Sequence, residues 1–158
     1  MGGGQERGVR SGTENVPLAG SFAVALIEAQ KNIEARVQKV TALRDVLFQE
    51  IQKNIPDVHL NGSTDNRTPN NCNISIPGLA GDMGVIALDA LGVAASTRSA
   101  CSAGDESPSH VIIALGTGPE VARQAIRLTL LPDATMSDAK YIAKALFEVA
   151  KRYKNMLQ

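Results

Sequence analysis

The hydrophobic positions in the first third of the chain predict one long amphipathic helix over residues 18–55. Large apolar side chains recur there at helical spacing along one face. The residues of this stripe are Leu18, Phe22, Leu26, Ala29, Ile33, Val37, Val40, Val46, Leu47, Ile51 and Ile55. The pattern allows one bend. Pro56 ends the helix, because proline has no N–H to donate and disfavours the helical conformation in the residue before it.

Short strands are expected further along the chain, where this pattern changes. Residues 72–76 alternate with a period of two, and residues 125–130 form a second strand-like run. Residues 58–60 and 93–95 are shorter candidates. The segment 61–71, between the predicted strands 58–60 and 72–76, is rich in Asn, Gly, Ser, Thr and Pro, a composition that predicts a loop.

Three short helices are predicted between and after these strands. Gly81 and Asp82 offer an N-cap for a helix over residues 83–91, which Gly92 closes. A brief helix over residues 109–115 is stopped by a glycine, and a proline opens the next one at residue 119.

A longer helix is predicted at the end of the chain, with Ser137 as its N-cap. Its lysines fall toward solvent, while its apolar side chains share the opposite face. The apolar residues are Ile142, Ala143, Leu146, Val149, Ala150, Tyr153 and Leu157. Helices surrounding a few short strands, without an internal repeat, indicate an α+β fold.

Length and composition narrow the classes of function. A chain of 158 residues with 44% hydrophobic content can bury one sizeable core. The net charge of +0 argues against nucleic acid or an anionic membrane as a partner. Only 3% of residues are aromatic, which argues against a protein that binds single-stranded nucleic acid by stacking its bases. No apolar run is long enough for a membrane span and no signal peptide is recognisable, so we expect a cytoplasmic protein.

The two cysteines lie in contrasting surroundings. Cys101 stands among small polar residues in the segment 96–110, which predicts an accessible loop and a reactive sulfur. Cys72 belongs to a strand and is expected to pack in the core. In a reducing cytosol we expect no disulfide between them, and no Cys/His cluster has the spacing of a zinc site.

The glycine-rich start of the chain has two interpretations. Residues 2–15 contain no Gly-Lys-Ser/Thr motif and follow no strand, so a nucleotide P-loop is not indicated. Their flexible backbone N–H groups, two arginines and a hydroxyl suit an anion such as phosphate. A flexible tail is the alternative.

The order of four sequence runs resembles the C-terminal part of cysteine desulfurases of the NifS/IscS type. The runs are GGGQERGVRSGTENVP, RTPNNCNISIPG, SACSAG followed by PSHVIIALG, and AIRLTL. The resemblance covers essentially the whole chain. It implies the aspartate-aminotransferase fold (fold type I), with residues 1–17 a strip of the large domain and residues 18–158 the small domain. The small domain is then expected to contain a long helix and a small antiparallel sheet covered by helices. It also implies pyridoxal 5′-phosphate (PLP) as cofactor, and conversion of L-cysteine to L-alanine with the sulfur left as a persulfide.

The resemblance assigns roles to three residues. Cys101 matches the persulfide-carrying nucleophile, and Arg127 matches the arginine that holds the substrate carboxylate. Thr13 matches the threonine that reaches the PLP phosphate of the partner subunit in a homodimer. An inert exposed cysteine and an ordinary surface arginine are the alternatives. His110 is expected to cap or pack a helix rather than to exchange protons.

The chain also departs from the family pattern. Arg98 stands where the family often has glycine, and residues 129–132 replace a Ser-x-Gly pattern after the arginine strand. The PLP lysine and its Ser-x-His-Lys context are missing, because all lysines fall in predicted helices. They are Lys31, Lys39, Lys53, Lys140, Lys144, Lys151 and Lys154.

The missing lysine predicts that the isolated chain is inactive. Its expected partners are L-cysteine, the PLP-binding N-terminal part of the enzyme, and a sulfur-acceptor or iron–sulfur scaffold protein. Two other hypotheses remain: a non-catalytic module that retains the fold for dimerisation or acceptor binding, and a thiol redox sensor that uses Cys101.

Overall fold

The computed structural model describes residues 3–97 and 107–156. The chain divides into two compact units, Met1–Ala35 and Arg36–Gln158. The first contains a 3-10 turn, η1 (Glu6–Gly8), and helix α1 (Val16–Gln30). The assignment of residues 1–17 to a large domain stays a prediction.

Helix α1 is apolar on all sides. Asn15 caps it, since its side chain accepts a hydrogen bond from Leu18 N at 3.0 Å. None of its residues is buried, and its large exposed side chains are Val16, Leu18, Phe22, Val24, Leu26 and Ile27. A helix of this kind is normally covered by another part of a protein.

The helix predicted over residues 18–55, with one bend allowed, is interrupted once, and two helices occupy this stretch. Asn32, between α1 and α2 (Ile33–Asn54), has a φ of 56°. This left-handed conformation interrupts the helix, and asparagine adopts it more readily than most residues. The predicted end before Pro56 is confirmed.

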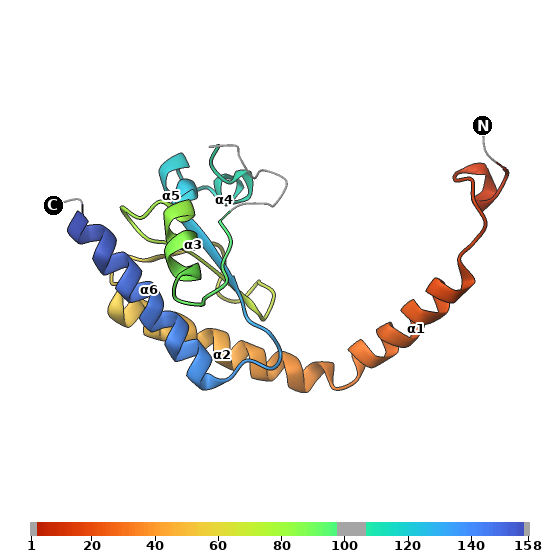
Figure 1. Ribbon diagram of the computed structural model, residues 1–158, viewed down its shortest axis with the longest axis horizontal. Helices are drawn as coiled ribbons and strands as arrows, with labels where there is room; N and C mark the ends of the chain where they lie inside the picture. The colour runs from red at the N-terminus through yellow and green to blue at the C-terminus, as the bar shows by residue number, and fades with distance from the viewer. Residues whose placement is uncertain (1–2, 98–106, 157–158) are drawn as a thin grey trace. The chain divides into compact units, whose positions relative to one another are not determined.

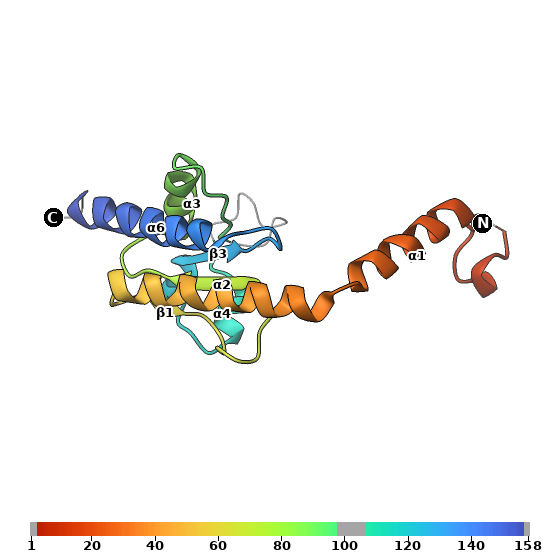
Figure 2. The same ribbon diagram turned by 90° about the horizontal axis from the view of Figure 1, so that it is seen from below.

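Three antiparallel strands form a sheet in the order β1 (His59–Leu60), β2 (Asn71–Ser75) and β3 (Ala125–Thr129). The three corresponding predicted strands are confirmed to within a residue or two at their ends. One face packs against α2 and α6 (Met136–Met156), which lie side by side along the sheet (Figure 2). Buried members of this core include Leu47, Ile51, Cys72, Ile74, Ile126, Leu128 and Leu146.

The N-cap of α6 is Thr135 rather than the predicted Ser137. Thr135 Oγ1 accepts a hydrogen bond from Asp138 N at 3.2 Å, and Asp138 Oδ2 accepts one from Thr135 N at 2.8 Å. This reciprocal capping box satisfies two backbone donors, which Ser137 could not do from inside the first turn. Hydrogen bonds from the Thr135 side chain and backbone lower the pKa of the Asp138 carboxyl.

The short helices are α3 (Gly81–Asp89), α4 (His110–Ala114) and α5 (Pro119–Arg123). In Figure 1, α4 and α5 lie near the start of β3. Helix α3 begins two residues earlier than predicted, without a side-chain cap. The strand predicted over residues 93–95 is wrong: the sheet contact falls instead on a single bridge between Ser96 and Arg127. These elements confirm the α+β fold class.

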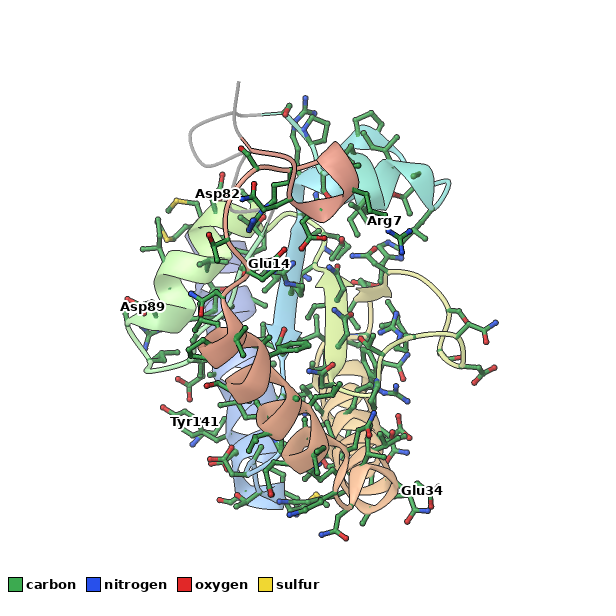
Figure 3. All side chains as sticks on the ribbon, turned by 90° about the vertical axis from the view of Figure 1, so that its right-hand side faces the viewer. Arg7, Glu14, Glu34, Asp82, Asp89 and Tyr141 are labelled. Carbon is green, nitrogen blue, oxygen red and sulfur yellow. The ribbon has the colours of Figure 1, made fainter. Side chains whose placement is uncertain are left out.

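Helix α3 is held at both ends. Figure 3 shows Asp82 and Asp89 at its two ends, with Tyr141 on the neighbouring α6. The Tyr141 hydroxyl donates to Leu91 O at 2.8 Å, just beyond the helix. The first residue of α3, Gly81, approaches the sheet so closely that an added Cβ would lie 2.6 Å from Ala125 O.

We expect Gly81→Ala to destabilise the protein by about 2 kcal/mol, because a methyl group there would also meet Thr97 Oγ1 and must push α3 off the sheet. Urea unfolding would measure the change. Gly20→Ala is the control, since no atom lies within 4 Å of a Cβ added at Gly20. Equal stability of the two variants would contradict the close approach.

Candidate functional site

Arg127 lies in the middle of β3 and points away from the core. Its neighbours Ile126 and Leu128 are buried, while Arg127 itself is exposed. The guanidinium Nη2 donates a hydrogen bond to Ser96 Oγ at 3.2 Å. The planar guanidinium therefore sits on a rigid strand with one edge fixed, an arrangement that suits recognition of a carboxylate or phosphate.

The backbone also ties Arg127 to Ser96. Arg127 N donates to Ser96 O at 2.6 Å, and Ser96 N donates to Arg127 O at 3.0 Å. On its other side Arg127 is opposite Asn73 of β2. Because both backbone groups of Arg127 face Ser96, Arg127 and Asn73 form a non-hydrogen-bonded pair, the kind in which opposing side chains lie closest.

The pairing continues across the sheet. Asn61 N donates to Asn73 O at 2.9 Å, and Asn61 Nδ2 donates to Asn73 Oδ1 at 2.8 Å. Residues directly opposite one another share a face of the sheet. We call these four residues, Asn61, Asn73, Arg127 and Ser96, the polar row. It crosses the face that points away from α2 and α6.

Sequence reasoning found Arg127 but missed the other three members of the polar row. The alternation of β2 contained a signal, because Asn71, Asn73 and Ser75 occupy the positions between its apolar residues. The sequence around Ser96 gave no such indication, because a bridge formed by a single residue produces no alternation of apolar and polar positions.

The predicted nucleophile Cys101 lies outside the described residues, as does Arg98. The described chain before it ends at Thr97, one residue after the bridge to Arg127. Cys101 is four residues further along the sequence.

Cys72 is buried, as predicted. It is 0% exposed on the core side of β2. Burial raises the pKa of the Cys72 thiol to about 12, and the positive charges of Arg67 and Arg44 offset only part of that effect. Cys72 thus stays a neutral thiol at ordinary pH and belongs to the core.

Thr13 lies in the first unit, in an exposed segment before α1. The glycine-rich region around it includes left-handed backbone at Gly8 and Gly12, with φ of 81° and 121°. Gln5 Oε1 accepts a hydrogen bond from Gly12 N at 3.3 Å. The proposed contact of Thr13 with a phosphate stays a prediction, and so does phosphate binding by this segment.

His110 is the first residue of α4 and its side chain is exposed. The expectation that it caps the helix is wrong, because Ser109 holds the N-cap position. That it packs on the helix stays a prediction.

The lysines lie in exposed positions, and the absence of a PLP anchor among them stays a prediction. All seven are exposed, and Lys39, for example, donates to Pro132 O at 2.8 Å. A lysine that forms a Schiff base is normally desolvated so that its amine can be neutral. The described residues thus fit a substrate carboxylate but not, by themselves, the whole PLP group.

A separate pocket of about 490 Å³ lies away from the polar row. It lies between the end of α2, the segment after β2 and the end of α6, and is lined partly by Ile55, Pro56, Leu79, Phe147, Tyr153 and Lys154. Within residues 3–97 and 107–156, no cluster of His, Cys, Asp and Glu could hold a metal ion. No helix in the same ranges is long and apolar enough to cross a membrane.

Comparison with known proteins places this geometry in a family. Residues 3–142 match the aminotransferase class-V pattern. The chain belongs to the aminotransferase class-V family. It is 38% identical to a cysteine desulfurase IscS of Dictyoglomus turgidum, over 98% of this chain and 39% of that protein. It is 37% identical to cysteine desulfurase IscS 1 of Archaeoglobus fulgidus, over 99% of this chain and 41% of that protein.

Solved structures agree with this class-V assignment. A NifS-like protein from Rickettsia africae superimposes with a TM-score of 0.77 at 31% identity, over 96% of this chain and 39% of that one. Another NifS-like protein gives a TM-score of 0.78 at 29% identity, over 96% of this chain and 38% of that one. The chain spans about 40% of the length of the curated relatives named above.

Proposed function

We propose that this chain is the C-terminal portion of a cysteine desulfurase, where it supplies the substrate carboxylate site and the cysteine that accepts sulfur. The observation that carries the proposal is that Arg127 is bound to Ser96 by both a backbone bridge and a side-chain hydrogen bond. These contacts hold an exposed arginine at the base of the segment that leads to Cys101. The similarity to IscS proteins along nearly the whole chain supports the choice of L-cysteine as substrate.

In the proposed reaction Arg127 binds the carboxylate of L-cysteine, and the Cys101 thiolate attacks the substrate sulfur. An S–S bond forms as the substrate Cβ–S bond breaks, and the electron pair left on the carbon is protonated to give L-alanine. PLP, when bound, supplies the electron sink for this cleavage. The persulfide on Cys101 then passes to an acceptor, such as a protein of iron–sulfur cluster or thio-cofactor synthesis.

The remainder of the enzyme contributes what this chain lacks. The PLP-binding part supplies the anchoring lysine, and in the proposed homodimer Thr13 reaches the phosphate of the PLP held by the partner subunit. The exposed apolar side chains of α1 are consistent with a helix that this missing part covers.

The test compares the chain alone with the same chain joined to the PLP-binding part. We expect the chain alone to hold no PLP covalently after borohydride reduction and to release no alanine from L-cysteine. The joined enzyme should do both. Alanine is measured by chromatography, and attached PLP by mass spectrometry.

Three outcomes would contradict the proposal. Reduction of PLP onto one lysine of the isolated chain would show that the chain anchors the cofactor itself. A joined enzyme that binds PLP and releases no alanine would indicate a non-catalytic module. Reversible oxidation of Cys101 by peroxide, in a joined enzyme without desulfurase activity, would favour a redox sensor.

A further inference from the structure

Asn73 faces Arg127 with an amide whose orientation the surrounding hydrogen bonds determine. Ser75 Oγ donates to Val121 O at 2.8 Å, because a carbonyl oxygen can only accept. Ser75 Oγ must therefore accept the hydrogen bond that it shares with Asn61, which identifies the Asn61 group as Nδ2. The same Nδ2 donates to Asn73 at 2.8 Å, so the atom of Asn73 on that side is Oδ1.

This chain of hydrogen bonds leaves the Asn73 Nδ2 group directed away from Asn61. The two residues that orient the Asn73 amide are buried and therefore held in place, since Asn61 is 4% exposed and Ser75 is 0% exposed. Asn73 itself is half-buried, so its amide can still reach a ligand. Among the described residues, Nδ2 has no hydrogen-bond partner.

Arg127, directly opposite Asn73 in the strand register, has further donors. Nη2 is bound to Ser96, while Nε and Nη1 have no partner in the parts of the chain that the structure describes. Side chains of such a non-hydrogen-bonded pair stand on Cα atoms about 4.5 Å apart. Donors that lie side by side without an acceptor between them are best satisfied by one anion with two acceptor oxygens.

We propose that Asn73 and Arg127 together bind the carboxylate of the amino-acid substrate, with Asn61 and Ser96 as the positioning residues of the two donors. This inference rests on the proposed function and adds Asn73 to its site. Arg127 supplies the charge and Asn73 supplies a second, neutral hydrogen bond. The pair therefore selects substrates that carry a carboxylate.

The test uses Asn73→Ala and Asn73→Asp in the PLP-loaded enzyme that contains this chain. For Asn73→Ala we expect KM for L-cysteine to rise about tenfold, because a hydrogen bond to a charged group is lost, while kcat changes less than twofold. Asn73→Asp should raise KM more, because its carboxylate repels that of the substrate and competes for Arg127.

A binding measurement complements the kinetics. L-Alanine and ethylamine differ only by the carboxylate, and each can be titrated against the absorbance of the bound cofactor. Asn73→Ala should weaken L-alanine binding about tenfold and leave ethylamine binding unchanged. Asn71→Ala is the matched control, because Asn71 lies on the same strand and face but is opposite Thr129 instead of Arg127.

The outcomes separate this inference from the proposed function. If Arg127→Ala impairs L-alanine binding and Asn73→Ala does not, Arg127 acts alone and the inference is wrong. If neither does, the carboxylate site itself is wrong. Equal weakening of L-alanine and ethylamine by Asn73→Ala would show general disruption of the sheet and would also overturn the inference.

Discussion

A thiol reagent at pH 8 will modify Cys101 at least about a hundredfold faster than Cys72 in the folded protein. Cys72 is 0% exposed, and burial raises the pKa of its thiol to about 12. At pH 8 only about one Cys72 thiol in ten thousand would be ionised, and the thiolate is the reactive form. The residues next to Cys101 in the sequence are small and mostly polar. Cys72, in contrast, packs among apolar side chains of the core.

Mass spectrometry of partly labelled protein will measure the two rates. The single variants Cys72→Ala and Cys101→Ser assign each rate to its residue, and labelling in urea, where the rates should become similar, is the control. Equal rates in the folded protein would remove the argument that Cys101 is the reactive thiol. In the complete enzyme, Cys101→Ser should abolish persulfide formation and leave PLP binding intact.

Replacing Arg127 by alanine should lower kcat/KM for L-cysteine by about a thousandfold in the complete enzyme. The reason is the loss of a charge-assisted contact to the substrate carboxylate together with the geometry that it imposes. Arg127→Lys should recover only part of the activity, because an ammonium group cannot reproduce the planar pair of donors. Steady-state kinetics with L-cysteine provide the measurement.

Arg123→Ala is the matched control for Arg127→Ala. Arg123 is also exposed and lies at the end of α5, four positions earlier, outside the polar row. Because Arg127 is an exposed residue, its loss should change the free energy of unfolding by less than about 1 kcal/mol. A kcat/KM within twofold of the wild-type value would show that Arg127 is an ordinary surface residue.

Local rules predicted many element boundaries from the sequence. Proline at Pro56 and Pro119 and glycine at Gly116 act through their own backbone geometry, so their effects hold in any fold. Asn32 and Thr135 were not predicted. The stripe of apolar residues runs through Asn32 without a visible change, and Thr135 and Ser137 are both good caps until the capping partner is known.

The sequence by itself determined the α+β class, three short strands, a buried Cys72 and, through the resemblance, the family and the candidate residues Cys101 and Arg127. These follow from composition, periodicity and motif order along the chain. Only the tertiary structure decided that Ser96, Arg127, Asn73 and Asn61 lie in one row. The register of strands far apart in sequence depends on how their apolar faces pack against α2 and α6, and a shift of one residue would turn Arg127 toward the core.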